Sequence, residues 1–232
     1  MPHPQISVEN VAKNFFMHLQ GGARLPVVKA AGFEVEAGEC VVLGGPSGAG
    51  KSSLLKMIFG NYRCDSGRIL VADGAEQVNI VLASPRRILR LRQSCMGYVS
   101  QFLRVIPRVS ALDIIEAAAR EQGVDADEGN QRAVALLDRL RVPQHLWNLP
   151  PATFSGGEQQ RINIARSFVA RHPVLLIDEP TAALDAANRR VVVELIAEKK
   201  REGVAILGIF HDDDVRAQVA DRIVDVTRFA AT

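Results

Sequence analysis

Apolar residues in this chain form several short, uninterrupted runs, and each run ends at glycine or at polar residues. Such runs lie at 40–43 ("CVVL"), at 174–177 ("VLLI") and within "GVAILGIF". Continuous apolar runs of this length are typical of strands that are covered on both faces in a parallel sheet. Because ligands gather at the carboxyl ends of such strands, the polar residues after each run are the first candidates for a functional site.

Other segments repeat their apolar residues at helical spacing. "SALDIIEAAAREQG" and "NQRAVALLDRL" read as amphipathic helices, and in the second Ala133, Leu136, Leu137 and Leu140 fall on one face. In "LASPRRILRLRQ" we predict a helix that begins at Ser84, with Pro85 in its first turn. We predict one domain over 1–232, with an α/β core at 1–101 and 171–232 and an inserted helical subdomain at 102–170.

The predicted helix after Ser84 carries Arg86, Arg87, Arg90 and Arg92. A solvated helix face is the ordinary explanation for such a set of charges. The alternative is a docking surface for an acidic partner. The sequence leaves both open.

Composition narrows the classes of function. The chain has 232 residues, of which 47% are hydrophobic and 23% charged, so we expect a packed globule. A net charge of +2 gives no reason to invoke nucleic acid. Cys40, Cys64 and Cys95 share no metal-ligand spacing, which favours buried or idle thiols in a reducing compartment. The sequence has neither a signal peptide nor an apolar run of about 18 residues. We therefore expect a cytoplasmic protein without direct membrane insertion.

The segment "GPSGAGKS" at 45–52 matches the phosphate-loop pattern G-x-x-x-x-G-K-[ST] and lies between a predicted strand and a predicted helix. Glycines let successive backbone N–H groups point at phosphate oxygens. Lys51 can reach the β- and γ-phosphates, and the Ser52 hydroxyl can bind Mg²⁺. We predict a nucleoside triphosphate site formed by Gly45, Pro46, Ser47, Gly48, Ala49, Gly50, Lys51, Ser52 and Ser53.

Asp178 and Glu179 follow the second apolar run. We expect Asp178 to hold Mg²⁺ and Glu179 to act as the base that polarises water for attack on the γ-phosphate. Gln101 follows "MGYVS" and could reach Mg²⁺ or the water, while His211 ends the third run and could donate to a γ-phosphate oxygen. Taken alone, Gln101 would be unremarkable, and a lone histidine is usually structural, but the position of His211 at a strand end favours a functional role.

A second phosphate-like helix start occurs far along the chain, in "FSGGEQQRINIAR". Ser155 followed by Glu158 is a capping box, which explains these two residues without any ligand. It does not explain Gly156 and Gly157, which are poor helix formers placed in the first turn. Glycines there would allow a ligand to approach the backbone closely.

Taken in order, the phosphate loop, Gln101, "SGGEQ", Asp178 with Glu179, "ALD" and His211 make the chain resemble the ATP-binding-cassette (ABC) ATPases. The resemblance implies an α/β fold: a P-loop NTPase core with a mostly parallel sheet, an N-terminal antiparallel β subdomain and an inserted α-helical subdomain. It implies ATP and Mg²⁺ as cofactors. It also implies Phe15 as the aromatic residue that stacks on adenine, with Phe16 as the alternative.

The resemblance further implies a partner of the same kind. ABC ATPases form head-to-tail dimers, so Ser155, Gly156, Gly157 and Glu158 would face ATP held by a second protomer. Asp185, which closes "TAALD", matches the dimer-contact loop of the family. Lys51, Gln101, Glu179 and His211 would then be the catalytic residues, and Ser52, Gln101 and Asp178 the metal ligands.

A narrower resemblance lies in "QFLRVI", "PRVSAL", "ATFSGGEQQRINIAR" and "GIFHDDDVR". These segments are similar to the L subunits of bacterial carbon–phosphorus lyase systems. This similarity implies ATP turnover in a phosphonate-processing complex that makes α-D-ribose 1-methylphosphonate 5-triphosphate, with the glycosyl transfer assigned to a partner. The implied partners are soluble core subunits of that complex and a second cassette, either a copy of this chain or the related K subunit.

Two other functions stay open. "PRVSAL" is also close to what lipoprotein-release and other export ATPases carry, so the chain could be the nucleotide-binding subunit of a membrane transporter. A small-molecule kinase could use the same phosphate loop, although it would leave the segment 155–157 unexplained.

Overall fold

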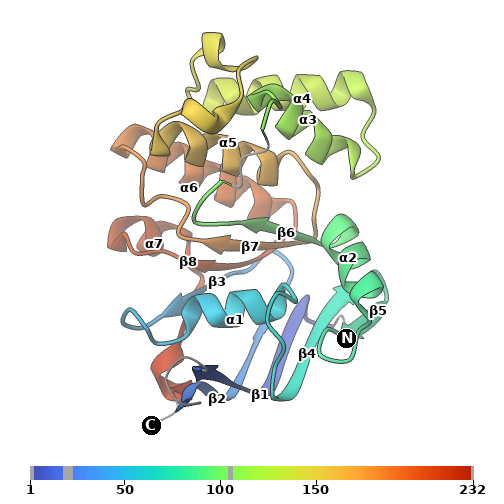
Figure 1. Cartoon of the computed structure of the whole chain (residues 1–232), viewed down its shortest axis with the longest axis vertical. Coiled ribbons are helices and arrows are strands. Elements are labelled where there is room, and N and C mark those ends of the chain that lie inside the picture. Colours follow the sequence, from blue (N-terminus) through green and yellow to red (C-terminus); the bar gives the residue numbers. More distant parts are fainter. Residues whose placement is uncertain (1–2, 18–22, 104–106, 231–232) are drawn as a thin grey trace.

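A computed structural model describes residues 3–17, 23–103 and 107–230 of the chain (Figure 1). Its centre is a five-stranded parallel sheet with the strand order β6-β7-β8-β3-β9. The strands are β3 (Cys40–Gly44), β6 (Met96–Val99), β7 (Val174–Asp178), β8 (Ala205–Ile209) and β9 (Arg222–Asp225). The strands predicted from the three apolar runs are therefore confirmed, and every residue of β7 and β8 is buried.

A second, antiparallel sheet has the order β2-β1-β4-β5. It consists of β1 (Ile6–Met17), β2 (Ala23–Val35), β4 (Ser66–Asp73) and β5 (Glu76–Asn79). The antiparallel β part expected from the family resemblance is thus present. The register of β1 against β2 shifts between Val8 and Asn14, so β1 is irregular where it approaches Phe15.

Helices cover the parallel sheet unequally (Figure 1). The helix after the phosphate loop, α1 (Lys51–Ile58), lies on the same side as the antiparallel sheet, and α2 (Pro85–Ser94) precedes β6. On the other side lie α3 (Ala111–Arg120), α4 (Ala126–Arg139), α5 (Gly156–Phe168), α6 (Ala186–Arg201) and α7 (Asp213–Val219). Short 3₁₀ turns occupy Gln144–Leu146, Pro151–Thr153 and Val226–Phe229. The helices predicted in the inserted segment are confirmed, and the boundaries at 102 and 170 stay a prediction.

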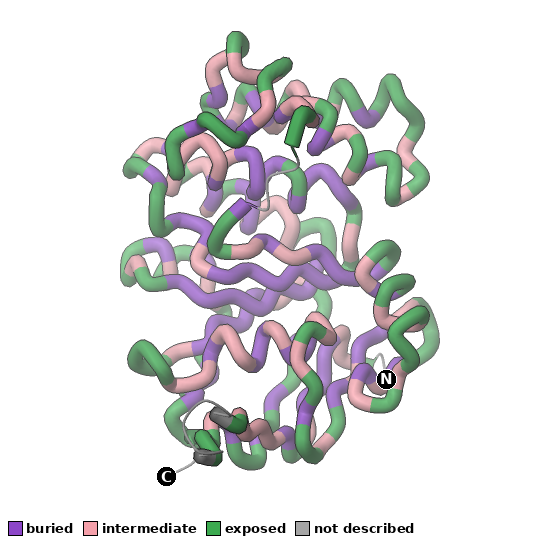
Figure 2. Tube along the Cα trace, viewed as in Figure 1, coloured by how far each residue is buried: buried purple, intermediate pink, exposed green. Residues whose placement is uncertain are grey.

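Two apolar cores lie on the two faces of the parallel sheet. Because side chains alternate along a strand, Leu175 and Ile177 pack into the core shared with α3–α7, whereas Leu176 packs into the core shared with α1 and the antiparallel sheet. Figure 2 shows the resulting buried band through the middle of the molecule. The sheet therefore carries a separately packed layer on each face.

The arginines of α2 divide into two kinds. Ser84 caps the helix and Pro85 is its first residue, as predicted. Arg87 pairs with Asp73 and Glu76, and Arg92 donates to the carbonyl oxygen of Phe59 at 2.9 Å. These two arginines serve the fold of their own chain. Arg86 and Arg90 are exposed and stay available to a partner.

The cysteines are buried free thiols, as the sequence suggested. Burial raises the pKa of Cys40 to about 12, which keeps this thiol protonated and unreactive. Within the ranges that the structure describes, no helix is both long and apolar enough to cross a bilayer.

Candidate functional site

The sheet order brings the predicted site residues to one edge. The phosphate loop follows β3, Asp178 ends β7, His211 follows β8 and Gln101 follows β6. Since β6, β7, β8 and β3 are neighbours in the parallel sheet, their carboxyl ends meet at the same edge. Residues that are far apart in the sequence therefore form one candidate site.

The phosphate loop is shaped by glycines in left-handed conformations. Gly48 and Gly50 have φ angles of 84° and 94°, and a side chain at Gly50 would come within 3.0 Å of Val27. No side chain caps α1, so the N–H groups of its first turn are free to bind an anion. The Lys51 ammonium group donates to the carbonyl oxygens of Gly45 at 2.7 Å and Pro46 at 2.8 Å. It is thus held over the loop that should bind phosphate.

Asp178 is a buried carboxylate held by two hydroxyl groups. Ser52 donates to its Oδ1 at 3.1 Å, and Tyr98 donates to its Oδ2 at 3.0 Å. Burial raises the pKa of Asp178, because removal from water disfavours the negatively charged carboxylate. Its hydrogen-bond partners, two hydroxyl groups, carry no positive charge that would offset this effect. Mg²⁺ prefers oxygen ligands and would supply that charge. The Ser52 and Asp178 oxygens fit such an ion, and the Gln101 amide, which contacts Glu179, stays a predicted ligand.

Glu179 lies between Gln101 and His211. The Gln101 amide donates to one carboxylate oxygen at 3.3 Å, and His211 Nε2 lies 2.7 Å from the other. Glu179 also has a φ of 53°, a conformation that costs a non-glycine residue about 1–3 kcal/mol and is concentrated at functional sites. Its N–H donates to the carbonyl oxygen of Ile209, which holds the strained turn. Glu179 is thus in contact with two other predicted catalytic side chains.

The capping box at the start of α5 is present. Ser155 Oγ accepts from the Glu158 N–H, and the Ser155 N–H donates to the Glu158 carboxylate at 2.8 Å. Hydrogen bonds from Ser155 lower the pKa of Glu158 and keep it charged. A side chain at Gly157 would lie 2.9 Å from the carbonyl oxygen of Ala183, so the fold of this chain itself requires that glycine. A side chain at Gly156 would meet nothing within 4 Å.

This helix start lies away from the phosphate loop of its own chain. Figure 1 shows α5 and α1 on opposite faces of the parallel sheet, and their side chains belong to different apolar cores. Asp185 caps α6, where it accepts from the Asn188 N–H at 2.8 Å. The cap is a structural role for Asp185, and its predicted role in a dimer contact stays a prediction.

Phe15 is partly buried on β1. Its ring meets Tyr62 edge to face with centroids 5.3 Å apart, and the Lys13 ammonium lies 5.2 Å from its centroid. Phe16 is 56% exposed. Stacking of either ring on adenine stays a prediction.

Three polar residues near the site were not predicted from the sequence: Tyr98, Asn163 and Ser167. Tyr98 supports Asp178 directly, and its place in a strand three residues before Gln101 could have indicated this. Asn163 and Ser167 are polar residues within the helical segment that begins at Ser155. Only the packing of that helix shows what they contact.

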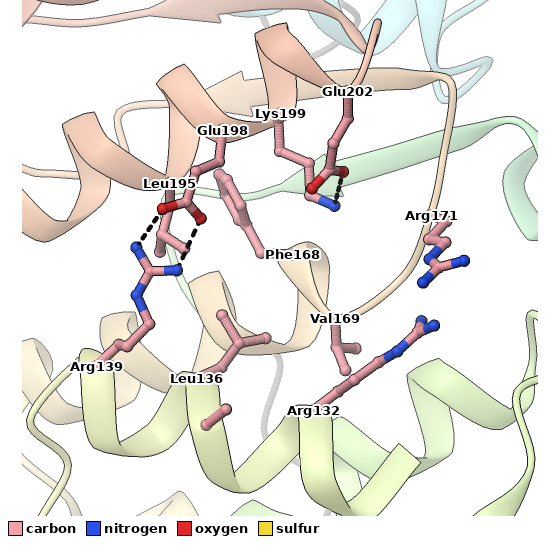
Figure 3. Close-up of a pocket in the computed structure, with 11 residues that line it drawn as sticks. Arg132, Leu136, Arg139, Phe168, Val169, Arg171, Leu195, Glu198, Lys199 and Glu202 are labelled. Atoms are coloured by element: carbon pink, nitrogen blue, oxygen red, sulfur yellow. Dashed lines mark hydrogen bonds and ion pairs between the residues drawn. The ribbon is translucent and has the colours of Figure 1, made fainter. Parts of the chain in front are cut away.

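A separate pocket of about 240 Å³ lies between α4, α5 and α6 (Figure 3). At one end Arg139 of α4 forms two hydrogen bonds with Glu198 of α6, at 2.7 and 2.8 Å. Arg171 and Glu202, which line the pocket, precede β7 and β8, so the pocket lies at the opposite end of these strands from the candidate site. The ion pair joins the helical segment to the core.

Residues 28–182, well over half of the chain, match the protein family described as "ABC transporter". The chain belongs to this family of ATP-binding cassettes. As an ABC ATPase it binds and hydrolyses ATP, which agrees with the phosphate loop and the residues around Glu179.

Named relatives of the cassette cover nearly its whole length. The uncharacterized ABC transporter ATP-binding protein YvrO of Bacillus subtilis is 33% identical over 94% of this chain and 92% of its own. The arginine transport ATP-binding protein ArtP of Haemophilus influenzae is 38% identical over 82% of this chain and 78% of its own. Both are named as ATP-binding proteins of transport systems.

Solved structures are similar over the same extent. A dimeric post-hydrolysis state of the cassette MJ0796, bound to ADP and Pi, has a TM-score of 0.84 at 25% identity, covering 96% of this chain and 95% of its own. A second dimeric structure of MJ0796, described as a bacterial ABC transporter cassette, has a TM-score of 0.85. The fold expected from the sequence is therefore confirmed.

Proposed function

We propose that the cassette works as a dimer with two composite ATP sites, each formed by the phosphate loop of one protomer and the segment 155–157 of its partner. The observation that carries this proposal is the placement of α5, whose N-terminus lies across the sheet from α1 (Figure 1). The free space at Gly156 leaves room for a ligand from outside the chain. The dimeric state of the similar MJ0796 structures supports the same arrangement.

At each site the phosphate loop and Lys51 bind the triphosphate, while Ser52 and Asp178 would hold Mg²⁺, which neutralises phosphate charge. Glu179 accepts a proton from the attacking water while the water oxygen forms a bond to the γ-phosphorus. The bond from that phosphorus to the bridging oxygen breaks, and ADP and phosphate leave. His211 Nε2, 2.7 Å from Glu179 Oε1, orients this carboxylate before ATP binds, and it would donate to a γ-phosphate oxygen once ATP is in place.

Replacing Glu179 with glutamine tests these roles. Without the base, turnover should fall by about 10²- to 10⁴-fold, while ATP still binds. The ATP-bound dimer should then persist long enough to be measured by light scattering after size-exclusion chromatography. The exposed Glu202, which pairs with Lys199 on α6, offers a charge-matched control, and Glu202→Gln should keep full turnover. Undiminished hydrolysis by Glu179→Gln, or a monomer at saturating ATP, would contradict the proposal.

The comparisons favour a membrane transporter as the system that the cassette serves. Its family and its named relatives are those of transport ATPases, including an arginine transporter. A groove of about 700 Å³ between α2, α3 and α5 opens near Gln101 and could receive a partner segment. The neighbouring Phe102 is 76% exposed, which suits an apolar contact. In this role the cassette would lie at the cytoplasmic face of the membrane.

The second candidate is the soluble, phosphonate-processing complex. It rests on the segments "QFLRVI" and "PRVSAL" and on those around Ser155 and His211. The first segment begins at Gln101, directly after Ser100, which lines the groove, so its sequence would influence which partner binds. Residues 104–106 of that segment lie outside the described residues. The named relatives do not include a protein of this kind, and the proposal therefore ranks below the transporter.

Purification of the tagged chain from its own cells separates these candidates. Retention with membranes and an integral membrane subunit supports the transporter. Recovery with soluble phosphonate enzymes supports the second candidate. The mass of the assembly with and without ATP distinguishes a pair of identical chains from a mixed pair. A kinase would release ADP only when an acceptor is added, so ADP formation without one excludes it.

A further inference from the structure

The buried face of α5 carries three polar side chains among apolar ones. Gln160, Asn163 and Ser167 are 4%, 2% and 9% exposed and share one face of the helix at the spacing i, i+3, i+7. Their neighbours Ile162 and Ile164 are fully buried apolar residues. Buried polar groups cost free energy unless they are hydrogen-bonded, so the partners of these three should explain their presence.

Each of the three binds backbone next to a residue of the catalytic site. Gln160 Nε2 donates to the carbonyl oxygen of Pro180, which follows Glu179, at 3.1 Å. Asn163 Nδ2 donates to the carbonyl oxygen of Ser100, which precedes Gln101, at 2.6 Å.

The Ser167 hydroxyl makes the third contact. It lies 3.2 Å from the carbonyl oxygen of Tyr98, whose phenol supports Asp178, and 3.0 Å from the carbonyl oxygen of Asn163 within its own helix. One helix face therefore holds the backbone beside Glu179, Gln101 and Tyr98.

The same helix begins at Ser155, with Gly156 as its first residue. A continuous α-helix moves as a stiff element, because each residue is hydrogen-bonded along its axis. A shift at its N-terminus is therefore passed to the backbone segments that this polar face holds.

We propose that Asn163 is a positioning residue: it ties the γ-phosphate-binding start of α5 to Gln101 of its own chain and so couples the two ATP sites of the dimer. The inference rests on the proposed composite sites. Phosphate bound in trans by the segment 155–157 sets the position of α5. Through Asn163, the position of α5 determines where Gln101 of the same chain lies relative to Glu179. These two residues belong to the other ATP site, the one formed by the phosphate loop of their own chain. ATP in one site thereby promotes turnover in the other.

The test compares Asn163→Leu with Ile162→Val. Leucine keeps the branched shape and the number of heavy atoms of asparagine and removes the donor to Ser100, whereas Ile162→Val disturbs the packing of the same helix without changing a polar contact. For Asn163→Leu we expect kcat to fall by about 10- to 100-fold, the usual effect of misplacing catalytic groups. The KM for ATP should stay within about threefold, because the phosphate loop is untouched. The Hill coefficient for ATP should fall from above 1 in the unchanged protein to about 1.

A merely structural role for Asn163 gives a different result. Both variants would then melt at lower temperature, and kcat per folded molecule would stay at the level of Ile162→Val, which would overturn the inference. A Hill coefficient of 1 in the unchanged protein would also overturn it.

Glu179→Gln and the double variant Glu179→Gln with Asn163→Leu separate the two proposals. If Glu179→Gln fails to dimerise with ATP, the composite site itself is wrong. If both dimerise and Asn163→Leu keeps its kcat and cooperativity, only the coupling is wrong.

Discussion

Gly156 and Gly157 differ in what an added methyl group would meet, and this difference allows a sharp test of the composite site. At Gly156 the new Cβ would have no heavy atom within 4 Å, whereas at Gly157 it would lie 2.9 Å from the carbonyl oxygen of Ala183. Neither glycine has a positive φ, so alanine is compatible with the backbone at both positions. Both substitutions therefore add one methyl group to the same turn of α5. The methyl group is accommodated by the fold at Gly156 and collides with the backbone at Gly157.

For Gly156→Ala we expect the isolated chain to be as stable as before or more stable, by up to about 1 kcal/mol, because alanine favours a helix over glycine. In the dimer the methyl group would stand between the first N–H groups of α5 and the γ-phosphate of the partner's ATP. Loss of one charge-assisted hydrogen bond costs about 1.5–3 kcal/mol, which corresponds to a fall in kcat/KM of roughly 10- to 150-fold. For Gly157→Ala we expect a loss of stability of about 1–3 kcal/mol from overpacking.

Steady-state phosphate release and chemical denaturation of both variants check these values. ATP binding to the monomeric chain, followed with a fluorescent analogue, should be the same in Gly156→Ala as in the unchanged protein. The reasoning is refuted if Gly156→Ala keeps full ATPase activity, since the exposed glycine would then face no ligand. It is also refuted if this variant loses stability, since the space beside Gly156 would then be filled by the chain itself.

Two further predictions concern charges. Asp178→Asn should raise the free energy of unfolding at pH 7 by about 1 kcal/mol without nucleotide, because a raised pKa means that the folded chain disfavours the ionised carboxyl. In denaturant titrations this gain should vanish below the ordinary pKa of 3.8, where aspartate is protonated in both states, and a destabilised variant at pH 7 would contradict the assignment. For Arg139 and Glu198, which are 37% and 38% exposed, a double-mutant cycle should give a coupling of only about 0.5 kcal/mol despite two hydrogen bonds. A coupling above 2 kcal/mol would show that the pair stabilises the contact of α4 with α6 more than solvent-exposed charges can.

The strands and most of the candidate site could be predicted because they depend on local patterns. The apolar runs before Asp178 and His211 identify buried parallel strands, and such strands place their polar ends at one edge. The pattern G-x-x-x-x-G-K-[ST] defines the conformation of a loop as well as its chemistry, so Lys51 could be assigned from the sequence.

The remaining features depend on contacts between segments that are far apart in the chain. Gly157 seemed to need a ligand, but the carbonyl oxygen of Ala183 on another loop already explains it. Asn163 and Ser167 lie inside a helix, where sequence gives no indication of which backbone they face. The φ of 53° at Glu179 also follows from tertiary packing, since glutamate has no preference for that conformation.

Because the parallel sheet separates the two apolar cores, substitutions can accumulate in one core during evolution without disturbing the other. Substitutions in α3 and α4 alter one core alone, and the residues that pack α1 beneath the phosphate loop belong to the other. New surfaces for new partners can therefore arise on the outer helices while the packing of α1 beneath the phosphate loop is inherited without alteration.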